Sequence, residues 1–369
     1  MKRGMYVLAV LSFLFIVSTG FANPYFDLKD AKWSYGNPCT NMTPAVAGGP
    51  AAKSRDLLTW RWLGEANIEL TFRGQVILLS AYFDVNPREP KVLDPSEINK
   101  VDALFLGHAH GDHMSDAAQV ARQTGAKVYA PRFAYEKLAV TGVPEQGILP
   151  LSASQVHYVN SGEVYKFDGF TVEPIHVNHS GINGPLPAPQ GPTPASGAAL
   201  QAYNLATWDN VPLTAEETAK KAAIMARGSM DALIRTQGVV VYLFTFGKDF
   251  RVIFYDSAST LNTPEIEAAM QRIGGTDVAT VAYAGGHSHT QVPYTMVPIK
   301  LFNPKLFIPN HHDGYEMPME KLFQAIRDEM PGTSAISPLY KEPICFDVKD
   351  HTATKISPRG DVWFYRMGK

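Results

Sequence analysis

LGHAHGDH, residues 106–113, is the stretch that decides the fold, because it places three imidazoles and one carboxylate within six residues. Imidazole is the commonest metal ligand in proteins, and a carboxylate suits a second, harder position. The apolar residues 101–106 predict a buried strand before it. Ser115 and Gly125 are the expected N-cap and C-terminal stop of a helix after it. The cluster is therefore expected on a loop at the carboxyl end of a strand, where rigid backbone can hold ligands.

The pattern His-x-His-x-Asp-His is complete at His108, His110, Asp112 and His113, and it resembles the signature of the metallo-β-lactamase superfamily. Burying three neutral histidines requires a partner for each ring, and a metal ion supplies all of these partners at once. The resemblance covers about residues 57–350. It implies an α/β (α+β) fold, the αββα sandwich, in which two mixed β-sheets are flanked by helices.

The ends of the chain differ from its middle. Lys2 and Arg3 precede an apolar run at 6–17, and small residues at Gly20 and Ala22 suit a cleavage site, so residues 1–22 are expected to be a signal peptide. An uncleaved anchor is the alternative. We further expect an irregular N-terminal extension at 23–56, one domain at 57–350 with an insertion at 184–236, and a C-terminal tail at 351–369.

Charge and cysteine content limit the partners. Residues 1–22 hold two basic and no acidic side chains, so the mature chain would carry 31 basic against 35 acidic groups, a net charge of −4. A protein with this net negative charge does not attract the phosphate backbone of nucleic acids electrostatically, so we expect no nucleic-acid partner. We also expect export to the periplasm or the medium, without a stable membrane span after cleavage. There, Cys39 and Cys345 could form a disulfide or remain two buried thiols. The oligomeric state stays open.

Histidines mark the strand ends. Nine of the eleven fall in four clusters, at 108/110/113, 176/179, 287/289 and 311/312, and each cluster follows an apolar run that predicts a strand. Histidines scattered over a surface would not follow strand ends in this way. We therefore expect the clusters to meet at one edge of the sandwich, which supports the resemblance independently.

The resemblance implies a role for each position of a two-metal site. His179 is preferred to His176 because Ser180 and Gly181 follow it, and His311 is preferred to His312 because it lies two residues after a proline. The implied first metal is held by His108, His110 and His179, the second by Asp112, His113 and His311, and Asp256 bridges them.

Asp256 follows a predicted hairpin, so a turn or capping role is its alternative. The expected catalytic residues are Asp112, which would orient or deprotonate the attacking water, and His289, which with His287 could donate to the developing oxyanion.

Residues 67–72 and 75–79 predict two strands joined by a tight turn at Arg73-Gly74. This opening hairpin resembles the lactonase and N-acyl-phosphatidylethanolamine phospholipase-D-like branch, but two positions depart from that branch. That branch usually carries His where this chain has Glu65, and Asp where it has Ser80. The Asp normally supports the metal loop, and Asp84 is the candidate substitute here.

The insertion contains a proline-rich stretch and a helix signal. Residues 184–197 predict an extended loop, either at the border of the site or as a surface linker. Thr214-Ala215-Glu216-Glu217 is a capping box that predicts a helix to about Arg235. That helix is expected either to pack on the sheet or to cap the substrate site.

The implied activity is that of an exported metal-dependent hydrolase with a small-molecule or lipid-like substrate. Two Zn²⁺ per chain, or Mn²⁺ or Fe, would hold a hydroxide that cleaves an ester, lactone or phosphodiester bond. A metal-binding or degenerate member without catalysis and a mono-iron oxidoreductase are the alternatives.

Overall fold

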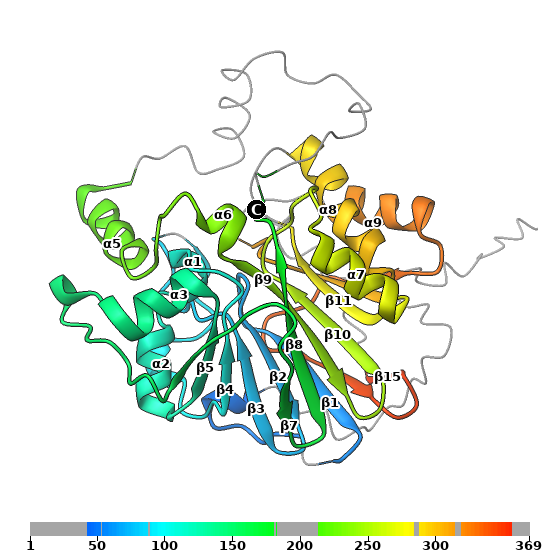
Figure 1. Cartoon of the computed structure of the whole chain (residues 1–369), viewed down its shortest axis with the longest axis horizontal. Coiled ribbons are helices and arrows are strands. Elements are labelled where there is room, and N and C mark those ends of the chain that lie inside the picture. The colour runs from blue at the N-terminus through cyan, green and yellow to red at the C-terminus, as the bar shows by residue number, and fades with distance from the viewer. Residues whose placement is uncertain are drawn as a thin grey trace, which may run out of the picture.

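Two mixed β-sheets face each other, and helices cover both outer faces (Figure 1). This arrangement confirms the expected αββα sandwich. No described helix has both the length and the apolar composition that crossing a bilayer requires. The predicted signal peptide and residues 184–197 lie outside the described residues. The computed structural model describes residues 43–52, 54–87, 89–180, 182, 213–283, 288–313 and 319–355, and their side chains except those of 288–291, 352, 354 and 355.

In the described part of the chain, the first sheet has eight strands in the order β15-β14-β1-β2-β3-β4-β5-β6. Strands from β15 to β3 pair antiparallel, and those from β3 to β6 pair parallel. The β2–β3 turn has φ values of 51° at Arg73 and 81° at Gly74, which is the tight hairpin turn predicted there. The bounds are β1 Leu57–Trp62, β2 Ile68–Phe72, β3 Gln75–Leu79, β4 Ala103–Phe105, β5 Lys127–Ala130, β6 Val156–Tyr158, β14 Pro343–Asp347 and β15 Thr352–Lys355.

The second sheet is built, within the same described residues, from seven strands in the order β13-β12-β11-β10-β9-β8-β7. Strands β7 to β10 form an antiparallel meander, and β9 and β10 form the hairpin predicted before Asp256. Strands β10 to β13 pair parallel, so their carboxyl ends share one edge. The bounds are β7 Tyr165–Phe167, β8 Phe170–Val177, β9 Val239–Phe246, β10 Phe250–Tyr255, β11 Thr276–Ala282, β12 Pro304–Asn310 and β13 Ser334–Ala335.

The helices begin and end at residues that favour helix termini. α2 stops at Gly125, whose φ of 75° suits glycine, and α7 starts at Thr263, whose side chain accepts from the Ile266 N–H. The α-helices are α1 Gly111–Met114, α2 Ala117–Thr124, α3 Arg132–Tyr135, α5 Ala215–Met225, α6 Ile234–Gln237, α7 Pro264–Ile273, α8 Ser288–Phe302 and α9 Met319–Glu329, with 3₁₀ turns at η3 Ala45–Ala47, η4 Pro95–Glu97 and η6 Pro144–Gln146 and a π-helix at η5 Glu136–Thr141.

Aromatic side chains fill the space between the sheets and reach the metal-loop end. The Phe105 ring packs edge-on against Tyr242 and Phe244, at 5.1 and 5.3 Å between centroids. The buried Tyr242 hydroxyl lies 2.9 Å from the Leu106 carbonyl and 3.0 Å from that of Tyr129. Because Leu106 is the last residue before the predicted metal loop, this core holds the start of the loop in place.

Three local expectations are wrong. Ser115 ends α1 and does not cap α2, whose N-cap is Asp116. The capping box at Thr214 is confirmed, but its helix stops at Met225, well before the predicted Arg235. Strand β15 pairs with β14, so the sheet continues into 351–369 and the first residues there are not a tail. The helix ends early where the chain packs against the distant residues 109–111, which local patterns do not encode. Strand β15 instead extends the sheet by a short antiparallel hairpin with β14.

The end of the N-terminal extension is part of the fold. Ala45 and Val46 are fully buried, and the Val46 N–H donates to the buried Glu69 carboxylate at 2.9 Å. Cys345 on β14 is buried and is not a free thiol. Cys39 lies outside the described residues, so the pairing of the two cysteines stays a prediction.

Candidate metal centre

Four strand ends bring the predicted ligands to the end of the sandwich where α1 and α6 lie (Figure 1). Strand β4 leads into His108, and β8 ends two residues before His179. Strand β10 ends directly before Asp256, and β12 ends directly before His311. Three of the four predicted histidine clusters therefore contribute residues to this edge, namely His108, His110 and His113, His179, and His311.

The first group of possible ligands is His108, His110 and His179. His108 Nε2 lies 3.1 Å from His110 Nδ1 and 3.2 Å from His179 Nε2. Nitrogens about 3.3 Å apart are what a tetrahedral ion with metal–nitrogen bonds of about 2.0–2.1 Å requires. The three ring nitrogens therefore have the spacing of a zinc-type site.

The second group is Asp112, His113 and His311. Asp112 Oδ2 lies 3.4 Å from His311 Nε2 and 3.7 Å from His113 Nε2. The histidines are buried, whereas the Asp112 side chain is 26% exposed. This carboxylate can therefore reach both a bound ion and an incoming molecule.

Hydrogen bonds on the far side of each ring set the direction of its metal-facing nitrogen. The Nδ1 atom of His108 lies 3.0 Å from Asp256 Oδ1, that of His179 lies 2.7 Å from the Ser180 carbonyl, and that of His311 lies 2.5 Å from a Glu65 carboxylate oxygen. An acceptor at Nδ1 holds the proton there and leaves the Nε2 lone pair free for a metal. Three rings are thus oriented by partners outside the two ligand groups.

Asp256 contacts one histidine of each group. Its side chain is fully buried, with Oδ1 at His108 Nδ1 and Oδ2 3.4 Å from His113 Nδ1. Gly107 makes this approach possible, because a Cβ there would lie 2.2 Å from Asp256 Oδ1. His108, His113 and Asp256 form a third group of possible metal ligands, and the bridging role of Asp256 stays a prediction.

The electrostatics favour ligand-competent protonation states. Burial and the neighbouring His108 lower the pKa of His179 to about 4, and burial lowers the pKa of His108 and His110 as well. Although burial opposes a charge on Asp112, the imidazole of His113 and that of His311 hold its pKa well below the usual value. At neutral pH these histidines are neutral and Asp112 is ionised, as metal binding requires.

The pair of His311 and Glu65 behaves differently. Burial disfavours a charged imidazole, yet the carboxylates of Glu65 and Asp112 at its two nitrogens raise the pKa of His311 well above its ordinary value. Burial, together with the nearby Asp313 carboxylate, raises the pKa of Glu65 to about 8. The pair therefore retains a proton between its two side chains.

The donor atoms fit divalent ions. The Nε2 atoms of His108 and His179 lie 3.2 Å apart. Because the acceptors at Nδ1 hold the proton of each ring there, neither Nε2 atom carries a hydrogen, and the two nitrogen lone pairs repel each other. Among the described residues, neither His113 Nδ1 nor Asp256 Oδ2 makes a hydrogen bond, although both are buried. A cation at the first group removes the lone-pair conflict.

A cavity of about 120 Å³ opens onto both groups. Its size suits two ions, water and one reacting group. Hydroxyl groups of Ser180 and Ser257 border it, and the Ser180 N–H donates to the Ser257 hydroxyl at 2.8 Å. The residues lining the cavity are His110, Asp112, His113, His179, Ser180, Asp256, Ser257, Ala258, Ala282 and His311.

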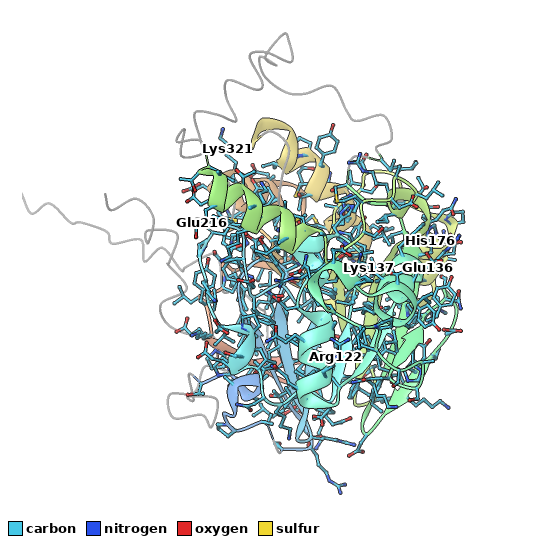
Figure 2. The ribbon with its side chains drawn as sticks, turned by 90° about the vertical axis from the view of Figure 1, so that its left-hand side faces the viewer. Arg122, Glu136, Lys137, His176, Glu216 and Lys321 are labelled. Atoms are coloured by element: carbon cyan, nitrogen blue, oxygen red, sulfur yellow. The ribbon has the colours of Figure 1, made fainter. Side chains whose placement is uncertain are left out.

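The structure places the weaker candidates elsewhere. His176 is partly exposed near the edge of the molecule, and its ring bonds to the Thr236 carbonyl at 2.9 Å (Figure 2). It is therefore neither a core residue nor a partner of the ligand groups. His312 stacks on Trp62 with ring centroids 4.4 Å apart. The His289 side chain lies outside the described residues, so its catalytic role stays a prediction.

Asp84 does not take the supporting role expected for it. Its carboxylate pairs with Lys220 at 3.4 Å and with Arg227 at 3.5 Å. Asp116, which is fully buried, instead accepts the N–H groups of Phe83 and Asp84 and lies 3.2 Å from Arg227. The sequence signal for this contact was weak, since Arg227 is 111 residues away.

Helix α5 packs against the metal loop and not against the sheet. Glu216 marks α5 in Figure 2, where the helix crosses the end of the molecule above α2. Ile224, buried on α5, packs against Tyr82 and Val85. The position of α5 favours the interpretation of the insertion helix as a cap.

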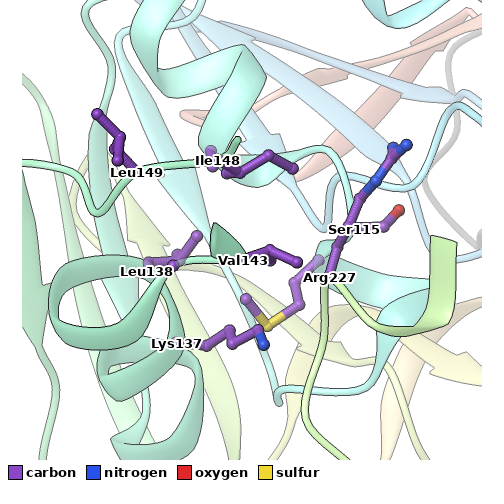
Figure 3. A pocket seen from close by; sticks show the side chains of 10 residues that line it. Ser115, Lys137, Leu138, Val143, Ile148, Leu149 and Arg227 are labelled. Atoms are coloured by element: carbon purple, nitrogen blue, oxygen red, sulfur yellow. The ribbon is translucent and has the colours of Figure 1, made fainter. Parts of the chain in front are cut away.

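A hollow of about 10 Å³ lies beside Arg227 (Figure 3). It has room for about one water molecule, which is too little for a substrate.

Gly228 is the closest contact between this segment and the metal loop. A Cβ on it would lie 2.4 Å from the Gly111 nitrogen and 2.7 Å from the Ala109 carbonyl oxygen, and both are backbone atoms that cannot yield. The Ser229 N–H also donates to the Ala109 carbonyl at 2.7 Å. The loop that carries His110 is therefore shaped by a segment more than 100 residues away in the sequence.

We expect Gly228→Ala to push residues 225–229 off the metal loop. Overpacking should lower the free energy of unfolding by about 1–3 kcal/mol and should weaken metal binding. Denaturant unfolding and zinc competition measure the two effects. Gly332→Ala is the control, because a Cβ at Gly332 meets no atom within 4 Å. Identical behaviour of the two variants would contradict the prediction.

Comparisons with known proteins agree with this geometry. Residues 75–203 match the family model described as a beta-lactamase superfamily domain. A UPF0173 metal-dependent hydrolase of Cupriavidus necator is 31% identical over 147 residues, which are 39% of this chain and 48% of that protein. One from Agrobacterium fabrum is 32% identical over 119 residues, 32% of this chain and 47% of that protein. This chain thus spans about half the length of the curated relatives it matches.

Among solved structures, Igni18, a metallo hydrolase from Ignicoccus hospitalis, is similar with a TM-score of 0.50 and 16% identity, covering 79% of this chain and 98% of that chain. At this identity the likeness concerns the fold. Fold and site together define a protein with the metallo-β-lactamase sandwich and histidine–aspartate groups able to hold metal. The match to the beta-lactamase superfamily domain spans residues 75–203 and so includes the metal loop.

Proposed function

We propose that this protein is an exported metal-dependent hydrolase that uses two zinc ions to cleave an ester, lactone or phosphodiester bond. The observation that carries the proposal is that five of the six residues in these two groups of potential ligands line one cavity of about 120 Å³. The relatives named metal-dependent hydrolases support the reaction class. Manganese or iron could replace zinc in such an imidazole and carboxylate site.

The assignment of ligands follows the two groups. His108, His110 and His179 would hold the first ion, and Asp112 with His113 and His311 would hold the second. Bound divalent ions supply Lewis acidity and lower the pKa of water from about 16 towards 7.

The side chains at the cavity complete the chemistry. Of the two described carboxylates that line it, Asp256 is fully buried and Asp112 is partly exposed. Asp112 is thus placed to orient the attacking water or to accept its proton. The small cavity admits only the scissile group, so the rest of a small-molecule or lipid-like substrate would remain outside it.

Export is the second part of the proposal. The basic and apolar start of the sequence supports it, and so does Cys345, which is not a free thiol. A disulfide persists in an oxidising compartment and rarely in the cytosol.

Metal analysis followed by a hydrolysis panel tests the proposed activity. Protein purified without chelator should contain about two zinc or manganese ions per chain. It should hydrolyse one class among aryl esters, lactones and bis-aryl phosphodiesters, and Asp112→Asn should be at least about 100-fold slower. One iron per chain without hydrolysis would instead favour the oxidoreductase alternative. No activity on any class with both sites filled would favour a non-catalytic member.

A further inference from the structure

We propose that Glu65 is a positioning residue for the second metal ion, and that it acts through His311. The proposal rests on the two-metal centre of the proposed function and adds a residue outside both ligand groups. Glu65 stands where the resembled branch usually carries histidine, so this chain has a carboxylate at a position where an imidazole is expected.

The contact between the two side chains is direct and buried. Glu65 is 3% exposed, and one of its carboxylate oxygens lies 2.5 Å from His311 Nδ1. The other ring nitrogen, Nε2, lies 3.4 Å from Asp112 Oδ2. An ionised carboxylate can accept hydrogen bonds but cannot donate them, so Glu65 selects the His311 tautomer that carries its proton on Nδ1. The Nε2 lone pair then points towards Asp112 and the second ion.

The backbone around the pair fixes the two side chains against each other. The His311 N–H donates to the Glu65 carbonyl at 2.8 Å, and the Trp62 indole N–H donates to the same carbonyl at 2.7 Å. The Glu65 N–H lies 3.1 and 3.0 Å from the two carboxylate oxygens of Asp313. The Tyr340 hydroxyl donates to Asp313 at 2.8 Å. The two segments are thus joined by main-chain contacts that do not depend on the Glu65 side chain.

Both residues adopt a conformation that non-glycine residues rarely use. The φ angle is 45° at Glu65 and 55° at His311. Such conformations persist where the surrounding structure holds them, and they concentrate at functional sites. Here they turn the two side chains towards each other from β-strand ends 246 residues apart in the sequence.

A carboxylate changes the quality of the ligand as well as its direction. A negatively charged acceptor at Nδ1 increases the electron density of the imidazole and strengthens its bond to a cation. Loss of such an outer partner typically weakens metal binding about 10–100-fold. The second ion should therefore depend on Glu65, whereas the first ion, held by His108, His110 and His179, should not.

Stepwise zinc titration against a competing chelator tests whether binding of the second ion depends on Glu65. Glu65→Ala should weaken binding of the second ion about 10–100-fold and leave the affinity for the first ion unchanged. Glu65→Gln keeps an acceptor without the charge and should lie between wild type and Glu65→Ala. The control is Glu69→Gln, which removes a fully buried carboxylate that pairs with Arg61 on the neighbouring strand. It should destabilise the fold and leave both zinc affinities unchanged.

The His311 tautomer gives a readout independent of activity. Long-range ¹H–¹⁵N spectra of the zinc-loaded protein, assigned with His311→Ala, should show the proton on Nδ1 in wild type and in Glu65→Gln. Its loss or exchange broadening is expected in Glu65→Ala. Equal second-ion affinities for wild type and Glu65→Ala would overturn the inference and leave the proposed function intact. A wild-type protein that binds one zinc ion or none would overturn the two-metal centre itself.

Discussion

His110→Ala should remove the first metal ion and leave the second in place. In the wild type, the ring nitrogens of His108, His110 and His179 have the spacing of a site with three nitrogen ligands. The variant keeps only two of these ligands. Elemental analysis after dialysis should therefore fall from about two ions to about one per chain. Hydrolysis should fall at least about 1000-fold, because one of two cooperating ions is absent.

His176→Ala is the matched control for this variant. His176 comes from the same predicted cluster as His179, but its ring bonds to the Thr236 carbonyl away from both ligand groups. It should keep two ions and full activity. Two ions in the His110→Ala protein, or a lost ion in the His176→Ala protein, would contradict the assignment of the first group.

Asp256→Ala should lose both ions, because its carboxylate contacts His108 of the first group and His113 of the second. It leaves a buried imidazole N–H without its acceptor, so the free energy of unfolding should fall by about 3 kcal/mol. Metal analysis and denaturant unfolding of the metal-free proteins measure the two effects separately.

Asp277→Ala separates the cost of losing a buried carboxylate from an effect on metal. Asp277 is also buried, and it accepts from the Arg251 N–H at 2.8 Å and pairs with His351 at 2.9 Å. It should lower stability and keep both ions. Asp256→Asn then distinguishes two roles of Asp256, since an amide oxygen can still accept from His108. Retained metal in this variant indicates an orienting role, and loss of both ions indicates the predicted bridge.

Much of the fold and most of the candidate ligands were predictable because their signals are local. Alternating or continuous apolar residues predicted the hairpins on both sides of Arg73-Gly74 and between β9 and β10, and the structure contains both. The preferred residues His179 and His311 belong to the groups of possible ligands, and His176 and His312 do not; their role as ligands stays a prediction. In each case the choice rested on neighbours within three residues.

Long-range packing decided what the local signals missed. The insertion helix stops at Met225 because the chain must bring Gly228 against Gly111, a contact no capping signal predicts. Asp84 was expected to support the metal loop, yet it pairs with the α5 segment, and Asp116 holds Arg227. Glu65 stood out in the sequence only as a departure from a pattern.

The sequence by itself determined the types of candidate metal ligand and their positions at strand ends, because a strand, a turn and a cluster of histidines are each encoded by neighbouring residues. Only the tertiary structure decided which nitrogen of each ring faces the cavity. That choice depends on the acceptor at the opposite nitrogen, and Asp256 and Glu65 reach His108 and His311 from 148 and 246 residues away. Contacts over such separations arise when the sheets pack, and packing sets their distances.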